Sequence, residues 1–404
     1  MRNLLVSLKN IWKLIVLLFL IFLTFSYAMF QGGFVSWFLF YSFLPFGIYG
    51  LALSFVSLKN MTVQRVFLKS DYNAGERLQV TVNVRRSHSF PLFYVIIEDC
   101  LNDQLIAAKK GKAKMFLVPH FKRDLGFSYE IKDLPRGEHQ FQSVRVKIGD
   151  LLGLIEKEYI VETNDRIIVY PSYEDIVYRP FANHYDQGMT ASKERVQRDT
   201  SMAIGIREYQ PGDKFSWINW KATAKRNDIM TKEFEQRQSH DVFVLMDCAP
   251  EKRFEAIVSF TASIVRAILR KGAQVGFMSQ SEDRVAFAFR GGEVHQQKVF
   301  YHLAKVKDNC PVTFDKVLES ETFLSQQSIS LMLVTSQLSK TLIEKAGFFA
   351  SRKGFITIFL LKQDGESPSK DEVALKSSAL ARGIRVIFVH DHLFNDAFSE
   401  VNRG

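Results

Sequence analysis

The chain has 404 residues, 53 Lys and Arg against 43 Asp and Glu, and a formal net charge of +10. Its length predicts two or three domains, and its apolar content of 47 % excludes a largely disordered protein. The three cysteines (Cys100, Cys248 and Cys310) show no C-x-x-C spacing, which excludes a zinc knuckle and a disulfide framework. This cysteine usage predicts a reducing compartment for the soluble part.

The first 60 residues contain a long uncharged stretch. No charged residue occurs from Leu14 to Leu58, a run of 45 positions that divides at the Gln-Gly-Gly sequence of residues 31–33. About 20 apolar residues cross the hydrocarbon core of a bilayer, so residues 1–60 predict a two-helix transmembrane hairpin. The alternative is one long buried helix in a soluble core, which the Gly-Gly pair and Pro45 would break.

Positive charges flank this hairpin on both outer sides. They are Arg2, Lys9 and Lys13 before the first span and Lys59, Arg65 and Lys69 after the second. Because Lys and Arg concentrate on the cytoplasmic side, we expect a multi-pass protein of the cell membrane with both termini in the cytoplasm. Membrane lipid is the expected partner of these cations, and no motif or basic face predicts nucleic-acid binding.

Residues 61–170 change to an alternation of apolar and polar residues with a period of two, as in Leu78–Val84 and Val144–Ile148. This period predicts half-buried antiparallel strands. Turn sequences such as Pro-Arg-Gly at 135–137 recur at intervals that suit a β-sandwich. We expect about seven short strands. Because no cluster of titratable residues suggests a catalytic or binding site, we expect this domain to be a spacer.

Residues 171–240 are interpreted as a linker with a distinctive segment, and residues 241–404 alternate apolar strands with amphipathic helices. Six strands are predicted, at Asp241–Asp247, Ala273–Ser279, Arg284–Arg290, Ile329–Thr335, Phe355–Leu361 and Ile384–His390. Continuous apolar runs of this kind are buried on both faces of a parallel sheet. The connection before Arg284 is too short for a crossover helix, so this strand should be antiparallel at an edge of a doubly wound α/β domain.

Asp247 closes the first of these strands. Ligands of doubly wound sheets bind at the carboxyl ends of strands where the winding reverses, and Mg²⁺ requires hard oxygen ligands. Asp247, Glu251 and Thr335 are therefore the candidates for a metal-dependent binding or hydrolytic site. The alternative is that Asp247 caps the next helix or bonds a loop, and we favour it. No nucleotide, dinucleotide or hydrolase motif occurs, so we expect no cofactor and no enzyme activity.

The most distinctive segment, residues 207–226, reads REYQPGDKFSWINWKATAKR. It resembles the signature of domain-of-unknown-function family 58, in which an Arg-x-Tyr-x-x-Gly-Asp segment is followed by Ile-x-Trp and Thr-Ala-Arg. The matching positions are Arg207, Tyr209, Gly212, Asp213, Ile218, Trp220, Thr223 and Ala224. Lys225 stands at the last Arg position, and Ser216 stands where the family usually carries Arg.

The resemblance implies a fold: a membrane helical hairpin, then a β-sandwich, then an α/β doubly wound von Willebrand factor A-like domain. The metal-dependent adhesion motif of such domains is Asp-x-Ser-x-Ser with a later Thr and Asp. This sequence keeps Asp247 but has Ala249 and Glu251 at the serine positions and Ser336 after Thr335. A bound metal is therefore not expected.

The resemblance also implies a function. It implies a membrane-anchored, cytoplasm-facing, non-enzymatic adaptor or scaffold that binds protein partners. The implied partner is a MoxR-type AAA+ ATPase, and the implied process is the assembly or activation of envelope-associated complexes.

The candidate partner-binding or signature residues are Arg207, Tyr209, Gly212, Asp213, Trp217, Trp220, Lys221, Thr223 and Lys225. In a structural interpretation, Trp217 or Trp220 packs between the soluble domains and Arg207 pairs with Asp213 to fix the turn. In an interface interpretation, aromatic and cationic side chains are the hot spots of a protein contact. We favour the structural role for the tryptophans and the interface role for the cations.

Overall fold

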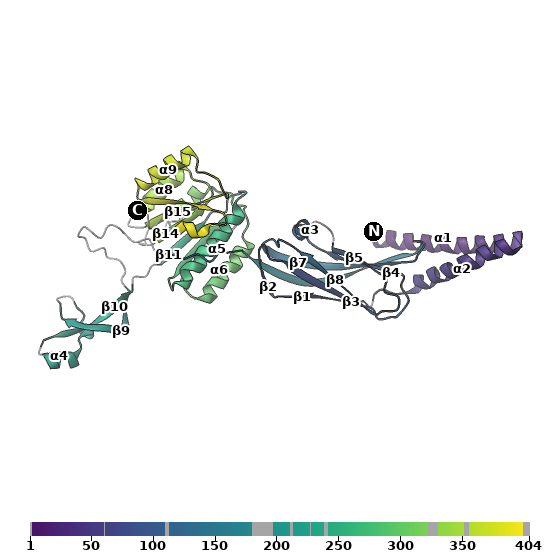
Figure 1. Ribbon diagram of the computed structural model, residues 1–404, viewed down its shortest axis with the longest axis horizontal. Helices are drawn as coiled ribbons and strands as arrows, with labels where there is room; N and C mark the ends of the chain where they lie inside the picture. The colour runs from purple at the N-terminus through teal and green to yellow at the C-terminus, as the bar shows by residue number, and fades with distance from the viewer. Residues whose placement is uncertain are drawn as a thin grey trace. The chain divides into compact units, whose positions relative to one another are not determined.

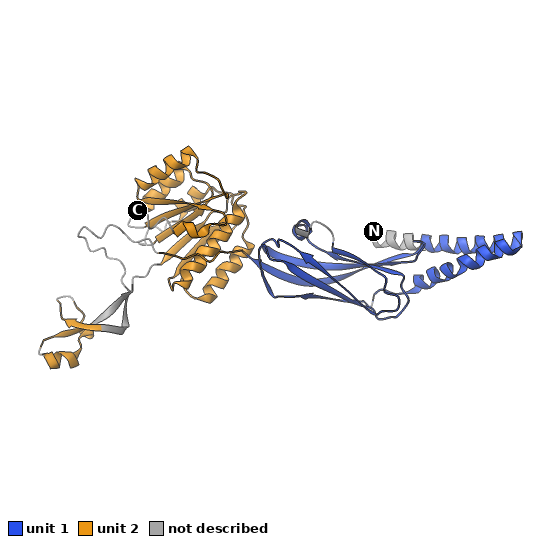
Figure 2. Cartoon of the chain, in the orientation of Figure 1, with its two compact units in different colours: residues 1–170 blue, residues 171–404 orange. Residues whose placement is uncertain are grey.

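The computed structural model describes residues 2–59, 61–109, 113–179, 197–210, 213–226, 228–237, 241–321, 330–350 and 355–398. The chain forms two compact units, residues 1–170 and residues 171–404 (Figure 2). Unit 1 contains the apolar helices and two β-sheets, and unit 2 contains the distinctive segment and a larger mixed α/β sheet (Figure 1).

Unit 1 begins with two apolar helices, α1 (Arg2–Gln31) and α2 (Phe34–Phe55). The segment Trp12–Gln31 and all of α2 are long and apolar enough to cross a membrane, which agrees with membrane association. Gly32 and Gly33 form the turn with φ angles of 61° and 85°, values that glycine adopts at low cost. Pro45 lies inside α2 and does not end it.

The rest of unit 1 is a two-layer β structure. Its three-stranded sheet contains β1 (Thr62–Phe67), β3 (Leu78–Arg85) and β6 (Asp124–Ile131) in the order β1-β3-β6. Its five-stranded sheet contains β2 (Asp71–Asn73), β8 (Glu156–Tyr170), β7 (Gly137–Gly149), β4 (Tyr94–Cys100) and β5 (Ala113–Leu117) in that order. Alternate residues of both sheets share one apolar core, as a sandwich requires.

The predicted alternation is confirmed in β3, where Leu78, Val80, Val82 and Val84 are buried and the intervening residues are not. The expected number of about seven strands is close to the observed number, but the expectation that all of them are short was wrong. The described part of unit 1 has eight strands, and β7 and β8 have 13 and 15 residues. A short helix, α3 (Asp103–Lys109), follows β4 and was not expected.

A charged cluster is buried inside the sandwich, although the sequence suggested none. The guanidinium of Arg65 is fully buried and lies 2.7 Å from carboxylate oxygens of both Asp99 and Asp165. The Tyr129 hydroxyl donates to Asp99 at 2.7 Å, and burial followed by the charge of Asp99 raises the pKa of Tyr129. Because each charge has a partner, we assign this cluster to the architecture of the sandwich.

Unit 2 contains a six-stranded mixed sheet. Its strands are β11 (Val242–Met246), β12 (Val275–Gln280), β13 (Arg284–Arg290), β14 (Ser330–Thr335), β15 (Phe355–Lys362) and β16 (Ile384–His390). They follow the order β13-β12-β11-β14-β15-β16, and all neighbours are parallel except β12 and β13. The predicted strands and the antiparallel edge are confirmed within the described residues.

The helices of this sheet are α5 (Phe254–Arg270), α6 (Glu293–Lys305), α7 (Phe314–Ser320), α8 (Lys340–Ala350), α9 (Lys370–Leu380) and the 3-10 helix η3 (Phe394–Phe398). Helix α5 packs through Phe260, whose ring lies 5.1 Å from that of Phe359 in β15 and 5.2 Å from that of Phe394. Since β12 and β14 lie on opposite sides of β11, the winding reverses between β11 and β14.

The start of the predicted linker packs on the α/β sheet. Asp175 accepts hydrogen bonds from Arg266 and Arg270 of α5. The guanidinium of Arg266 also lies 4.4 Å from the ring centroid of Tyr173, and Tyr178 is buried. Residues 171–178 therefore belong to the α/β domain, which corrects the interpretation of the whole stretch 171–240 as a linker.

Candidate functional site

The distinctive segment folds as a small lobe on a β-hairpin. Strand β9 (Gln197–Glu208) pairs antiparallel with β10 (Met230–Arg237). Between the two strands lie the 3-10 helix η1 (Phe215–Trp217) and the short helix α4 (Trp220–Arg226) (Figure 1). We call residues 197–237 the signature lobe. Strands β9 and β10 were not predicted, because their residues lack a clear alternation of apolar and polar side chains.

Arg207 and Asp213 close the first turn of the signature lobe. Their guanidinium and carboxylate lie 2.7 Å apart, and the second carboxylate oxygen of Asp213 accepts the backbone N–H of Gln210 at 3.0 Å. The predicted Arg207 to Asp213 pair is thus present. Gly212, which precedes Asp213 and belongs to the predicted set, lies outside the described residues.

Thr223 and Asn219 attach α4 to the hairpin. The Asn219 side chain accepts the N–H of Ala222 at 3.3 Å and caps the helix. The Thr223 hydroxyl donates to the Asn219 carbonyl at 3.1 Å and accepts the N–H of Met230 at 3.0 Å. Thr223 is therefore a structural residue that fixes the orientation of α4 on β10.

Two further aromatic residues of the predicted set pack within the signature lobe. The ring of Tyr209 stacks on that of Phe215 at 6.4 Å. The ammonium of Lys214 lies 5.5 Å from the ring centroid of Trp217, which is half-buried. These contacts are local and favour the structural interpretation for Tyr209 and Trp217.

The outer face of α4 is exposed. Trp220 is 68 % exposed, and Lys221 and Lys225, which lie one helical turn apart, are exposed as well. Phe215 of η1 is 77 % exposed. Neither lysine forms an ion pair with any residue that the structure describes. For Trp220 the exposure favours the interface interpretation, contrary to our preference for a structural role.

The second candidate site lies where β11 and β14 end. The Thr335 hydroxyl donates to one carboxylate oxygen of the buried Asp247 at 2.7 Å, and the Ala249 N–H donates to the other at 2.9 Å. Burial raises the pKa of Asp247, and these two bonds oppose that rise. The sheet topology thus brings two of the three predicted metal candidates into contact, but as a hydrogen-bonded pair.

Glu251, the third metal candidate, accepts a hydrogen bond from the Gln337 side chain at 2.6 Å. Across the described ranges, no three His, Cys, Asp or Glu side chains gather as a metal site would need. Each oxygen of Asp247 accepts a protein hydrogen bond and Glu251 is bonded to Gln337, so the described residues do not present the several oxygen ligands that a divalent cation prefers.

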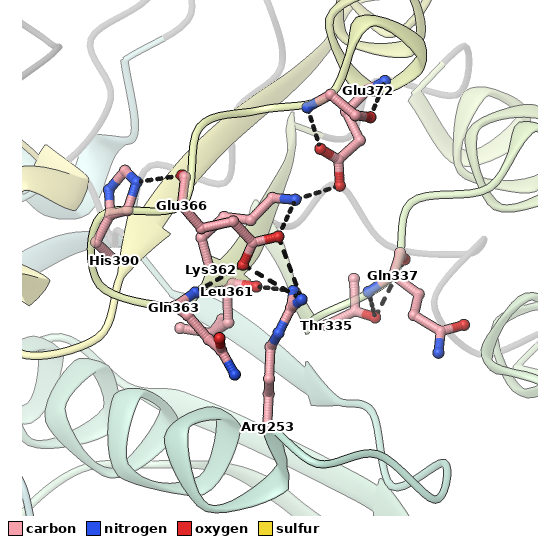
Figure 3. A network of polar contacts seen from close by, with 10 residues as sticks. Arg253, Thr335, Gln337, Leu361, Lys362, Gln363, Glu366, Glu372 and His390 are labelled. Carbon is pink, nitrogen blue, oxygen red and sulfur yellow. Dashed lines mark hydrogen bonds and ion pairs between the residues drawn. The ribbon is translucent and has the colours of Figure 1, made fainter.

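The ends of β15 and β16 carry a polar network that sequence reasoning missed (Figure 3). Glu366 lies 3.2 Å from Arg253 and 3.3 Å from Lys362, whose side chain is nearly buried. Lys362 also pairs with Glu372. The N–H of Gln363, together with the two cations, lowers the pKa of Glu366. Each charge is paired, so this network fixes the loop after β15 and offers no open ligand position.

Comparison with known proteins agrees with the signature. The model of the family described as "Protein of unknown function DUF58" matches residues 205–402. The uncharacterized protein YeaD of Bacillus subtilis (strain 168) is 39 % identical over 380 residues, which cover 93 % of this chain and 94 % of that protein.

Two solved structures are distantly similar to this chain. The CARDB domain of a Pyrococcus furiosus protein is 8 % identical and covers 27 % of this chain and 92 % of that chain, with a TM-score of 0.20. The sporulation control protein Spo0M of Bacillus subtilis is 19 % identical and covers 27 % and 49 %, with a TM-score of 0.14. Scores this low carry no argument about fold or function. The family match and the full-length relative together show that this chain belongs to the DUF58 family.

Proposed function

We propose that this chain is a membrane-anchored, non-enzymatic adaptor whose signature lobe binds a protein partner. The observation that carries the proposal is the exposed face of α4, where Trp220 stands beside the lysines at 221 and 225. A large aromatic ring in water has an unsatisfied apolar surface, and aromatic anchors are enriched at interface hot spots.

The geometry behind this face supports a recognition role. The Arg207 to Asp213 pair and the bonds of Thr223 hold η1 and α4 on the hairpin. Rigid presentation lowers the entropy that binding costs. The signature residues thus divide into a framework that holds the lobe and an exposed set that is available to a partner.

The charges define the chemistry of the partner. Lys221, Lys225 and Arg226 are exposed on one short helix and carry no ion pair with the described residues. A partner with acidic side chains around an apolar pocket would match this face. Following the family resemblance, we assign this role to a MoxR-type AAA+ ATPase engaged in the assembly or activation of envelope-associated complexes.

The proposed adaptor is anchored by α1 and α2 as a multi-pass hairpin with both termini in the cytoplasm. Lys13 at the start of the first span and Lys59 after the second support this orientation. We further propose that the sheet of unit 2 is von Willebrand factor A-like. The strand order β13-β12-β11-β14-β15-β16 with an antiparallel β13 supports this assignment.

Affinity capture of the tagged full-length protein from gently solubilised membranes tests the proposal. The wild type should recover an AAA+ ATPase, and Trp220→Ala should reduce its recovery about 30-fold, the effect of a 2 kcal/mol hot spot. Leu380→Ala on α9 is the matched control, because Leu380 is also a large exposed apolar residue. Equal recovery with Trp220→Ala and with the control would refute the role of the signature lobe.

A further inference from the structure

One end of the sandwich in unit 1 lies beside the last turns of α2. The Tyr49 hydroxyl donates to the Pro91 carbonyl at 3.1 Å, and the Tyr49 ring lies 4.5 Å from that of Phe93. Tyr49 precedes the last residue of α2, Phe55, by six positions, or about 9 Å along the helix axis. If α2 spans the membrane, the loop between β3 and β4 therefore lies at the depth of the lipid headgroups.

A buried cation occupies this loop. Arg86 is only 4 % exposed. Its guanidinium donates to the carbonyls of Phe90 at 2.9 Å, Lys122 at 3.1 Å and His120 at 3.3 Å. Desolvation lowers the pKa of Arg86, but an arginine stays charged in proteins.

Among the described residues, Arg86 has no counter-ion. No carboxylate among the described residues pairs with it, whereas the buried Arg65 of the same sandwich pairs with two. Carbonyl oxygens satisfy the N–H donors but do not neutralise the charge. A buried charge without a partner costs several kcal/mol, and an anion bound next to Arg86 would offset that cost.

Arg86 also lines a small pocket at the surface of unit 1. Arg86, Ser87 and His88 line one part of it, and Ser57 contributes from the segment that follows α2. The positive charge of Arg86 would attract a phosphate, and the hydroxyl and imidazole groups would supply hydrogen bonds to it. The remaining lining is mostly apolar, from Val56, Leu58, Met61, Phe90 and Leu92. This combination suits a ligand with an anionic phosphate and an apolar body.

The neighbouring loop between β5 and β6 has the composition of a membrane-interface segment. Phe121 is 66 % exposed, and it lies between His120 and Lys122, with Val118 exposed three positions earlier. Exposed apolar side chains beside a lysine are typical of segments that enter the headgroup region of anionic bilayers.

We propose that the pocket at Arg86 binds the phosphate of an anionic phospholipid. This inference rests on the proposed membrane anchoring, and it is independent of any protein partner. Bound there, the lipid would supply the counter-ion that Arg86 lacks and would join the sandwich to the headgroup layer.

Native mass spectrometry of the full-length protein in detergent tests the inference, with phosphatidylglycerol, phosphatidylcholine or inorganic phosphate added. We expect one phosphatidylglycerol to remain bound, with phosphatidylcholine at least tenfold weaker. Ser87→Asp, which places a carboxylate at the exposed lip of the pocket, should weaken phosphatidylglycerol binding about tenfold to a hundredfold. Arg86→Gln should do the same, provided that its circular dichroism matches that of the wild type.

Arg85→Gln is the matched control, because Arg85 is adjacent, 76 % exposed on its side chain and paired with Asp124. It should retain the tightly bound lipid. Equal losses in Arg85→Gln and Ser87→Asp would overturn the site in favour of diffuse electrostatics, as would wild-type binding by a folded Ser87→Asp variant. Binding of inorganic phosphate without phosphatidylglycerol would overturn the lipid as the ligand. Failure of the protein to fractionate with membranes would instead refute the anchoring itself.

Discussion

Replacement of Thr335 by valine tests the interpretation of the sheet edge as a hydrogen-bonded pair. Valine fills the same space but removes the donor that lies 2.7 Å from Asp247. It also removes the acceptor of the Gln337 N–H at 3.1 Å. Asp247 would keep only the Ala249 N–H. A buried bond to a charged group contributes about 1.5–3 kcal/mol, so we expect a loss of about 2–3 kcal/mol in the free energy of unfolding.

The assay is thermal unfolding of the full-length protein in detergent, followed by circular dichroism. For a unit of this size, that loss predicts a fall in Tm of about 4–12 °C. Thr231→Val is the matched control. The Thr231 hydroxyl is buried and has no hydrogen-bond partner among the described residues, so its removal should be neutral or slightly stabilising. An unchanged Tm for Thr335→Val would show that the hydrogen bond from Thr335 to Asp247 does not stabilise unit 2.

The same assay distinguishes this account from the metal hypothesis. Asp247→Asn keeps an acceptor for the Ala249 N–H and removes a desolvated charge, so we expect a change within about 1 kcal/mol and no effect of Mg²⁺. A Tm that Mg²⁺ raises in the wild type but not in Asp247→Asn would establish a metal site and contradict our interpretation.

Three other substitutions give separate tests. A double-mutant cycle of Arg207→Ala and Asp213→Ala, measured by urea unfolding, should give a coupling energy of about 1 kcal/mol, since Arg207 is partly exposed; zero coupling would remove the pair from the framework of the signature lobe. Arg65→Met should cost about 3–5 kcal/mol in the same assay, because two carboxylates would lose their cation, and a loss below about 1 kcal/mol would contradict the buried cluster. Because the pKa of Glu366 is lowered, its contribution to stability is present above the ordinary carboxyl pKa of about 4.3 and is lost as the pH falls below it. Glu366→Gln should therefore make the Tm fall less steeply with decreasing pH. The same dependence of Tm on pH in the variant and the wild type would contradict the network.

The sheet of unit 2 could be predicted because each strand carries its own local signal. Residues 242–246 are apolar without interruption, and all five are buried in β11. The short connection before Arg284 likewise sufficed to predict an antiparallel neighbour for β12, because a crossover helix cannot fit in four residues. Period and connection length are properties of the sequence alone, so they need no knowledge of distant contacts.

The buried charges could not be predicted, because their partners are far apart in the chain. Arg65 pairs with Asp99 and Asp165 from other strands, 34 and 100 positions later. Arg86 is buried by carbonyls of a loop more than 30 positions away. In the sequence both arginines look like ordinary surface cations of a strand or turn. Arg65 is buried because the two sheets face each other, and Arg86 is buried because β3 pairs with β6 and brings the loop of His120 and Lys122 beside it.

In the candidate site, the pairing of Arg207 with Asp213 follows from their spacing, whereas exposure does not. Trp217 and Trp220 are three residues apart and alike in chemistry, yet one is half-buried and the other exposed. The difference arises from the bonds that attach α4 to β10, which involve Thr223 and Met230. The sequence therefore did not distinguish the residues that hold the signature lobe together from those that are exposed on α4, because that difference depends on contacts in three dimensions.

The most direct test of the adaptor proposal is a photo-crosslinking amino acid placed at position 220 of the full-length, membrane-embedded protein. Position 380 on α9, where Leu380 is equally exposed, provides the reference. We expect a specific crosslink from position 220 to an AAA+ ATPase and none from position 380. Crosslinks from position 220 to lipid alone, or the same products from both positions, would contradict it.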